Sequence, residues 1–422
     1  MNAALPLTSL SLSLFSLSYL LSPLTAAPTP SFGKPQPWAK PIEDYIAKGR
    51  ETHPQGFNQG ISALQVFDGR LWIGYGDANY NLGTKQPIEF RCFESPDKPT
   101  AVPVRVLAEG QGAPQRSPYD TGEEQIDSYR ICDGVLYVAG VDSNDPDEAW
   151  TQAKPAPAKL IEGNLFKLGH TADGAPVWHK YRSVPGAEHL HDVMSFGGAL
   201  YAVGSGSKDR VEWESGEIFR FLWKSTDGGK SFSVVHREMF PDRGKGDTRF
   251  TRLLATGPVL HVFGYTNPAG NGQPAMGTHL RMLADGALKP VTHADVGRIA
   301  SLLFMKTWPL SGNRGIATST DTSRGGLNEL FLVDESGLRD IRELGGRQVL
   351  DHLEDPAGDA SLLLVRDGVM YSVVRVAHDP AAEPVTVLEL GRRPASCFAL
   401  WQGALYVGLR DGQVLVCHAA GS

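Results

Sequence analysis

The sequence predicts an all-β fold that is assembled from repeated units of four short strands. Its 47 glycines and 29 prolines in 422 residues suit many tight turns better than long helices. A hairpin pattern recurs along the chain, in which a tight turn containing glycine precedes a pair of large apolar or aromatic residues. One further turn, at residues 225–232, carries a specific sequence between two apolar runs, which places it on a hairpin.

The hairpin repeats set the predicted number of units. The copies lie at residues 67–72, 131–137, 196–201, 256–261, 308–316, 367–371 and 402–406. Their pitch of about fifty to sixty residues leaves room for four strands and generous loops in each unit. The units are predicted to begin near Ile61, Gln125, His189, Arg249, Arg298, Gln348 and Ser396. This gives seven units, while a hairpin at Asp367 and Gly368 that opened a unit would give six.

Residues 225–232 read Ser-Thr-Asp-Gly-Gly-Lys-Ser-Phe and fill every fixed position of SxDxGx(S/T)(F/W). In this pattern the Asp227 side chain caps its own turn, a glycine takes a conformation that other residues resist, and Phe232 packs beneath the hairpin. An imperfect echo at residues 171–178 keeps Asp173 but has Ala175 in place of the glycine. The alternative is a simple Asp-Gly hairpin turn without family meaning.

The motif resembles the Asp-box, or BNR repeat, of sialidases and other β-propellers. That resemblance implies a β-propeller with seven four-stranded blades, in which the motif joins the third and fourth strands of one blade. Residues 74–77, 128–130 and 189–192 also look like segments of exported bacterial propeller proteins. The resemblance fails for sialidase chemistry, because the chain has no Arg-Ile-Pro and no spacing that marks an arginine triad.

The last unit has only three convincing strands, which would leave a bare sheet edge. We therefore expect a strand from residues 28–60 to close the ring, with the propeller occupying residues 61–422. Deletion of residues 28–46 is expected to be tolerated, whereas deletion through Gly60 should remove the closing strand.

Residues 1–27 contain no charged side chain and are rich in Leu and Ser, which predicts a secretory signal peptide and a secreted or periplasmic protein. An uncleaved anchor or a stalk near the membrane is the alternative, because no basic residue precedes the apolar run. The remainder of the chain offers no stable membrane span. The four cysteines are few for an exported chain, so disulfides are not expected to hold the fold together.

A net charge of −7 gives no electrostatic reason to expect a nucleic acid partner. The longest predicted loops follow the second and fourth strands of the units and so share one face. They cover residues 77–86, 109–124, 142–161, 204–215, 237–248, 265–274 and 319–326. Long loops on one face and short turns on the other predict a ligand-binding face.

The candidate ligand-binding residues lie at the inner-strand starts and on these loops. They are His189, His191, Asp192, Arg249, Asp77, Asn79, Asp142 and Glu124. The two imidazoles could face the channel as ligands, or be structural groups satisfied by hydrogen bonds. A third ligand beside them is not identifiable, so no metal site is predicted. The loop at residues 142–148 offers oxygen ligands of the kind calcium takes, although a solvated turn explains them equally.

Catalytic signatures such as a GxSxG elbow, a P-loop and HExxH are absent from the sequence. The sequence therefore predicts an exported propeller that binds an extracellular carbohydrate or another polymer on its long-loop face. The alternatives are a glycan-active hydrolase or lyase on the same fold, and a purely structural envelope protein. Catalytic residues and the oligomeric state do not follow from the sequence.

Overall fold

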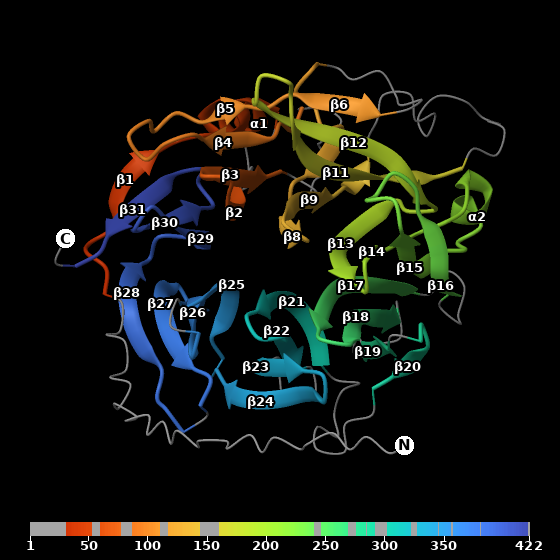
Figure 1. The fold of residues 1–422 in the computed structure, drawn as a ribbon. Coiled ribbons are helices and arrows are strands. Elements are labelled where there is room, and N and C mark those ends of the chain that lie inside the picture. Colours follow the sequence, from red (N-terminus) through yellow and green to blue (C-terminus); the bar gives the residue numbers. More distant parts are fainter. Residues whose placement is uncertain are drawn as a thin grey trace, which may run out of the picture.

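A computed structural model describes the chain at residues 31–52, 60–76, 87–109, 117–143, 160–239, 246–268, 276–283, 285–291, 302–321, 327–344, 346–355, 358–379 and 381–420. Seven blades surround a central axis, and the chain visits them in sequence order (Figure 1). This arrangement confirms the predicted seven-bladed β-propeller. None of the helices in the described ranges is long and apolar enough to cross a membrane.

The strands of the first three blades follow one another from the inside of the ring outward. Blade 1 contains β2 (Ile61–Phe67), β3 (Arg70–Tyr75), β4 (Arg91–Phe93) and β5 (Val102–Pro103). Blade 2 contains β8 (Arg130–Cys132), β9 (Val135–Ala139), β11 (Glu162–His170) and β12 (Pro176–Pro185). Blade 3 contains β13 (His189–Phe196), β14 (Ala199–Gly206), β15 (Phe219–Ser225) and β16 (Ser233–Met239), with α2 (Arg210–Glu214) between β14 and β15.

The next three blades repeat this order. Blade 4 contains β17 (Gly246–Thr256), β18 (Val259–Pro268), β19 (Met276–Leu283) and β20 (Leu288–Pro290). Blade 5 contains β21 (Leu302–Leu310), β22 (Arg314–Asp321), β23 (Leu327–Asp334) and β24 (Gly337–Glu343). Blade 6 contains β25 (Gln348–Glu354), β26 (Ala360–Asp367), β27 (Met370–Ala377) and β28 (Val385–Gly391).

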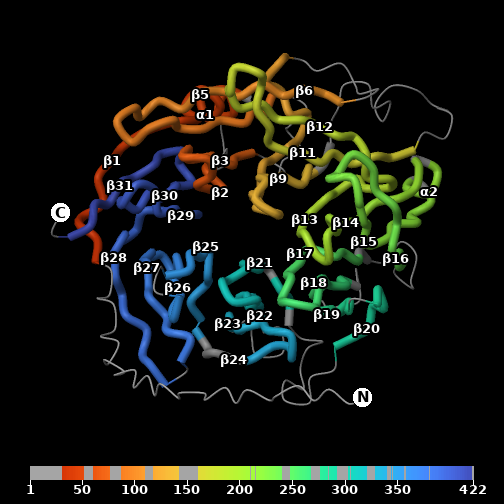
Figure 2. Tube along the Cα trace, in the orientation of Figure 1, coloured from red at the N-terminus to blue at the C-terminus, as the bar shows by residue number. Residues whose placement is uncertain are grey.

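Blade 7 is completed by the N-terminal part of the chain, as predicted. It contains β29 (Ala395–Trp401), β30 (Ala404–Leu409), β31 (Val414–His418) and β1 (Gln36–Ala39). Strand β1 runs antiparallel to β31, so the two ends of the ring lie side by side (Figure 2). The expectation that residues 28–46 can be removed is wrong, because they contain this closing strand. Helix α1 (Glu43–Thr52) follows it, and Ile42 and Ile46 are buried in the core of blades 1 and 7.

Two blades carry extra strands. Strand β6 (Val106–Glu109) adds to the outer edge of blade 2, where it runs parallel to β12. Strands β7 (Glu123–Gln125) and β10 (Val141–Ser143) extend the inner side of blade 3, with Val141 opposite His189. These additions cover sheet edges that a four-stranded blade would leave exposed.

The hairpins between first and second strands contain the predicted turns. Asp68 and Gly69 both have positive φ angles, 50° and 72°, as a two-residue hairpin loop of this type requires. The hairpin predicted at residues 367–371 is present too, but it joins the second and third strands of blade 6, so the six-blade alternative that opened a unit there is wrong. Its Asp-Gly sequence forms a tight turn wherever two strands meet, so the local signal cannot tell which pair it connects.

The turn at residues 225–232 joins β15 to β16, the third and fourth strands of blade 3. The carboxylate of Asp227 accepts hydrogen bonds from the Ser225 hydroxyl at 2.8 Å and from the Ser231 amide at 3.0 Å. Slight burial opposes ionisation, but the hydrogen bonds from Ser231 and Ser225 lower the pKa of Asp227 to about 2. The echo joins β11 to β12 at the matching place in blade 2, where Thr171 donates to Asp173.

The inner strands share a backbone irregularity that shapes the channel. Bulges interrupt the pairing of the inner strand at Ser62, His191, Thr251, Met305, Leu350 and Ser396. In four blades a glycine on the second strand lies opposite the bulge, at Gly74, Gly204, Gly264 and Gly408, and a side chain there would collide with the inner strand. A Cβ atom at Gly204 would lie 2.0 Å from the His189 carbonyl oxygen, and one at Gly264 2.1 Å from that of Arg249. Each bulge re-aims the residue that follows it.

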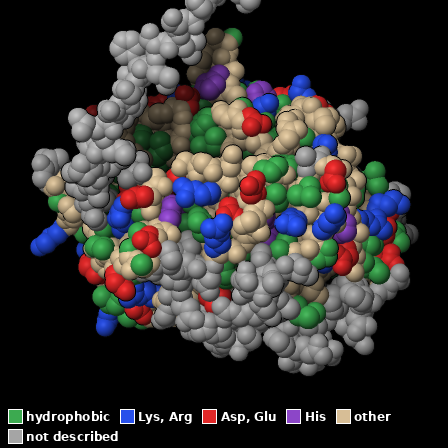
Figure 3. All heavy atoms as spheres, turned by 60° about the horizontal axis from the view of Figure 1, so that its bottom comes forward, with side chains coloured by type: hydrophobic (Ala, Val, Ile, Leu, Met, Phe, Trp, Pro, Cys, Tyr) green, Lys and Arg blue, Asp and Glu red, His purple; other side chains and the backbone are tan. Residues whose placement is uncertain are grey.

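The core lies within and between the blades and is rich in aromatic side chains. Trp72, Trp178, Trp223 and Trp401 are all fully buried. The four cysteines are free and buried, which confirms that disulfides do not hold this fold. On the face drawn in Figure 3, basic and acidic side chains are interspersed, with both signs present across the surface.

Candidate functional site

The residue after each inner-strand bulge lies at an equivalent place in its blade. These residues are Ala63, Asp192, Arg252, Lys306, Asp351 and Cys397. Four neighbouring blades, the third to the sixth, therefore bring charged side chains to one level of the channel. Their partners differ, and this difference divides the channel into two parts.

One part of the channel is closed by Arg130, at the start of β8. Its guanidinium binds both carboxylate oxygens of Asp192, with the Nε and Nη2 distances both 2.7 Å. It also reaches across the ring to blade 5, where it donates to the carbonyl and hydroxyl oxygens of Thr307 at 2.9 Å. A bidentate arginine–carboxylate pair of this kind is among the strong hydrogen-bonded contacts in proteins.

The Asp192 carboxylate is buried, and both of its oxygens accept hydrogen bonds. Besides Arg130, it accepts hydrogen bonds from its neighbour Val193 at 2.9 Å and from Leu253 of blade 4 at 2.8 Å. Burial alone would lower the pKa of Arg130, but the charge and hydrogen bonds of Asp192 raise it. Blades 2, 3, 4 and 5 are thus tied together by one buried ion pair.

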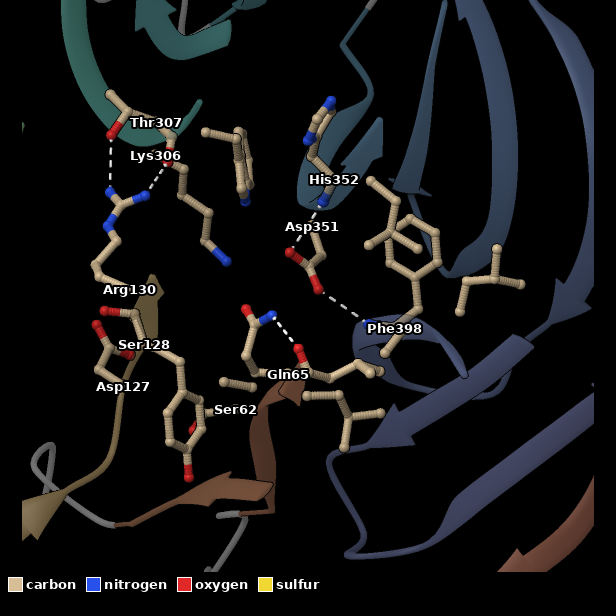
Figure 4. Close-up of a pocket in the computed structure, with 18 of the residues that line it drawn as sticks. Ser62, Gln65, Asp127, Ser128, Arg130, Lys306, Thr307, Asp351, His352 and Phe398 are labelled. Carbon is tan, nitrogen blue, oxygen red and sulfur yellow. Dashed lines mark hydrogen bonds between the residues drawn. The ribbon is translucent and has the colours of Figure 1, made fainter. Parts of the chain in front are cut away.

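The other part of the channel contains a cavity of about 230 Å³ (Figure 4). The inner strands of blades 1, 4, 5, 6 and 7 line it, together with residues 127–130 of blade 2. The lining residues of β25 and β29, at 351–353 and 398–400, follow the bulges of those strands. The cavity therefore lies between the bulges and the hairpins that join first to second strands.

Asp351 uses the same backbone contacts as Asp192 but has no arginine. Its oxygens accept hydrogen bonds from the amides of His352 and Phe398, each at 2.9 Å. Burial raises the pKa of Asp351, and the positive charge of Lys306 opposes that shift. Lys306 itself donates a hydrogen bond to the Leu350 carbonyl oxygen. Figure 4 shows the Lys306 ammonium and the Asp351 carboxylate turned toward the same space.

The cavity wall next to Asp351 is held by a chain of hydrogen bonds through blade 6. His352 shares a hydrogen bond of 2.9 Å with the hydroxyl of Ser361, which is 3.0 Å from the ring of His378. Burial, with the charge of His378, lowers the pKa of His352 to about 3. The His352 ring is therefore neutral at physiological pH.

Of the predicted histidines, His189 lies at the start of β13 and His191 is the bulged residue of that strand. The rings of His189 and His191 stack with centroids 6.0 Å apart. Burial and the charges of His189, Arg249 and Arg252 lower the pKa of His191 well below its usual value. The Nε2 atom of His191 is buried and has no hydrogen-bond partner among the described residues. The two imidazoles thus lie side by side, and Arg249 is close enough for its charge to act on His191.

The remaining predicted residues do not join one described site. Asp192 is occupied by Arg130, and the buried Glu124 lies in β7 on the inner side of blade 3. Asp142 lies in strand β10, while Asp77 and Asn79 lie outside the described residues. Most of the long loops also lie outside them. In the described part of the chain, no group of three or more metal-ligating side chains gathers.

The ligand-binding residues predicted from the sequence do not include those that line the cavity. They are Gln65, Asp127, Arg130, Lys306, Trp308 and Asp351. The sequence does hold one signal for these positions, a glycine within the second strand of a blade, as at Gly204 and Gly264. Such a glycine marks a close approach of the first strand and hence a bulge. The residue after that bulge is then a candidate for the channel.

The chain matches no protein-family model, and no curated protein matches it. The similar solved structures include β-propellers. A polysaccharide lyase of family PL25, an ulvan lyase bound to -[GlcA(1-4)Rha3S]-, is 11% identical over 92% of this chain and 93% of its own, with a TM-score of 0.49. The propeller domain of the Trilobed protease from Pyrococcus furiosus is 9% identical over 86% and 96%, with a TM-score of 0.49. An α-L-arabinanase from Penicillium chrysogenum is 13% identical over 68% and 91%, with a TM-score of 0.41. Likenesses at this level carry no functional argument.

Proposed function

We propose that this chain is an exported, Asp-box-type β-propeller that binds an extracellular carbohydrate or another hydroxyl-rich polymer at its central channel. The observation that carries the proposal is the cavity between blades 1, 2, 4, 5, 6 and 7. Its wall offers an ammonium group at Lys306, a carboxylate at Asp351 and an amide at Gln65. Charged and amide groups of this kind bind sugar hydroxyls through directed hydrogen bonds.

The groups in the wall are held in place before any ligand arrives. Backbone amides fix the Asp351 carboxylate, and the Gln65 amide nitrogen donates to the Val66 carbonyl oxygen at 3.0 Å. The Gln65 side-chain oxygen is then the group that accepts a hydrogen bond from a ligand. Trp308 adds an aromatic surface of the kind that packs against a sugar ring. Preorganised groups reduce the ordering cost of binding.

The size of the cavity bears on how much of a ligand it holds. Pockets for drug-sized ligands occupy about 300–1,000 Å³, so 230 Å³ suits one ring or one chain end. The rest of a polymer would then lie outside the cavity. The long-loop mouth, with His189, His191 and Arg249, is the second surface that we propose for contact with the polymer.

A glycan array with the full chain tests the proposal, followed by calorimetric titration of each glycan that binds. We expect binding that is weakened by Asp351→Asn and unaffected by a substitution of the exposed Lys289. A reducing-end assay on the same glycans separates a binding protein from a hydrolase or lyase, because only an enzyme releases product. If no glycan or other polyhydroxylated polymer binds, the proposed function is wrong.

Export is a separate part of the proposal and has its own test. It rests on the uncharged, Leu- and Ser-rich residues 1–27. Expression of the full chain in a bacterium, followed by N-terminal sequencing of the protein from the periplasm or medium, should give a start near Pro28. A protein that stays in the cytoplasm with its first residues intact would contradict export.

A further inference from the structure

Lys306 is a cation of the cavity wall that forms no ion pair with a carboxylate of the described residues. Its ammonium group donates to the Leu350 carbonyl oxygen. In the described part of the chain, no Asp or Glu oxygen lies within 4.0 Å of its Nζ atom. A lysine ammonium has three N–H donors, so donors remain for a ligand. The half-buried side chain lines the cavity.

A second cation lines the same cavity from the neighbouring blade. Arg252 follows the bulge of β17 as Lys306 follows the bulge of β21, so the two side chains enter from equivalent places. The guanidinium donates to the Thr251 carbonyl oxygen at 2.7 Å and lies 3.7 Å from the Asp127 carboxylate. Arg252 therefore lines the cavity next to Lys306, but Asp127 offsets its charge.

The acidic groups that could neutralise Lys306 are held elsewhere. Arg130 and two backbone amides occupy Asp192. Two other backbone amides and the side chain of Trp308 hold Asp351. The Gln125 side chain donates to Asp127 at 2.8 Å. Lys306 and Asp351 face the same space, yet each is bonded to the backbone instead of to the other. The cavity thus presents a separated positive and negative group.

We propose that the cavity recognises an acidic sugar, whose anionic substituent binds Lys306 while a neighbouring ring hydroxyl donates a hydrogen bond to Asp351. This inference rests on the proposed function and narrows its ligand class. A carboxylate and a sulfate ester both offer the oxygen acceptors that an ammonium group binds. An adjacent hydroxyl is the donor that a carboxylate requires. A uronic acid or a sulfated sugar supplies both groups on one ring.

Four small probes separate these chemistries in titrations of the full chain by calorimetry or NMR. They are D-glucuronate, D-glucose 6-sulfate, D-glucose and inorganic sulfate. The three sugars differ at one carbon, so their comparison isolates the charge. We expect one or both acidic sugars to bind about tenfold or more tightly than glucose, because a hydrogen bond to a charged group discriminates by that order. Added salt should weaken binding of the acidic sugars more than that of glucose.

Variants of one side chain then assign the charge to Lys306. Lys306→Gln keeps a donor for the Leu350 carbonyl oxygen and removes the charge, whereas Lys306→Arg keeps the charge. We expect the glutamine variant to lose about tenfold in affinity for the acidic sugars and little for glucose, with the arginine variant close to the wild type. Lys289→Gln removes one charge from an exposed position on β20 and serves as the matched control.

The outcomes distinguish this inference from the proposed function. Equal affinity for glucose and both acidic sugars, or an unchanged affinity of folded Lys306→Gln for the acidic sugars, overturns the inference and leaves sugar binding standing. Binding of sulfate that needs Lys306, without binding of any sugar, supports the anion site and contradicts the carbohydrate proposal. Failure of all four probes to bind contradicts the acidic-sugar site. Selective binding of one acidic sugar identifies the substituent as carboxylate or sulfate.

Discussion

Asp192 and Asp351 occupy equivalent places in blades 3 and 6 but differ in the cation beside them. Each follows a bulge in its inner strand, bonds the amide of the next residue and bonds an amide of the next blade. Asp192 also binds Arg130, whose guanidinium continues to Thr307 on the far side of the ring. Asp351 has the Lys306 ammonium and the Trp308 side chain nearby instead of an arginine, and it borders an open cavity.

The difference teaches that the cation decides whether a channel carboxylate is structural or available. An arginine fork binds two carboxylate oxygens and still has a donor for a third group, so it can close the space between blades. A lysine ammonium is a point charge and cannot brace two partners in the same way. We interpret the Arg130–Asp192 pair as the brace of the ring and the Lys306–Asp351 pair as its open counterpart.

The largest effect on stability is expected when the Arg130–Asp192 ion pair is removed. Arg130→Met leaves the buried Asp192 carboxylate without its cation and should cost about 3–5 kcal/mol of unfolding free energy, measured in denaturant. The double variant Arg130→Met with Asp192→Asn removes the stranded charge and should recover part of that loss. A loss below about 1 kcal/mol for Arg130→Met would show that the pair does not brace the ring.

Acidic pH should lower the stability of the folded chain through His352, which lines the cavity. Its pKa is about 3 in the folded chain against an ordinary value of 6.5, so the unfolded chain takes up a proton that the folded chain refuses. Stability should therefore fall as the pH drops from about 6.5 toward about 3. His352→Gln should flatten the dependence of the melting temperature on pH over that range, and His418→Gln, at an exposed position, should not. An unchanged pH profile for His352→Gln would contradict the buried neutral imidazole.

The turn at residues 225–232 provides a stability change remote from the channel. Asp227→Ala removes the acceptor for Ser225 and Ser231 and should cost about 1–3 kcal/mol, with a smaller loss for Asp173→Ala in the echo. Because the pKa of Asp227 is lowered to about 2, its contribution is present above pH 3.8 and is lost as the pH falls toward 2. Glycan binding by the folded variant should not change. Binding lost at an unchanged melting temperature would contradict this structural role.

The smallest effect on stability is expected at the long-loop mouth. Replacing His189 and His191 together with Ala should lower the melting temperature little, because His191 Nε2 makes no hydrogen bond to a described residue. Glycan affinity should fall if the polymer reaches this mouth from the cavity. A sharp fall in melting temperature would mark the histidines as structural, and an unaltered affinity of the folded variant would remove them from the binding surface.

Sequence reasoning reached the fold because hairpin signals are local. Asp68-Gly69 and the turn around Asp227 are each recognisable within eight residues, and their repetition gives the blades. The Asp367-Gly368 hairpin left six units open as an alternative, because a local signal carries no information on strand order. A closing strand was expected within residues 28–60, but its position was not found, because the four residues Gln36–Ala39 gain their partner only from the far end of the chain.

The site was harder to predict than the fold, since its contacts join distant parts of the sequence. Arg130 and Thr307 are 177 residues apart. Nothing near Arg130 shows that its partner is Asp192, and nothing near Lys306 shows that a bulge turns it to the channel. His189 and His191 were found because they alternate at a strand start. The charged residues that follow bulges have no such local pattern, apart from the glycines opposite some of them.

The central claim is that the ring has a closed part and an open part, and that ligand enters the open part. The most direct measurement is the glycan affinity and melting temperature of the double variant Lys306→Gln with Asp351→Asn. The account predicts that affinity for the array-selected glycan falls at least about tenfold while the melting temperature stays within a few degrees of the wild type. A folded double variant that binds this glycan as tightly as the wild type would contradict the claim.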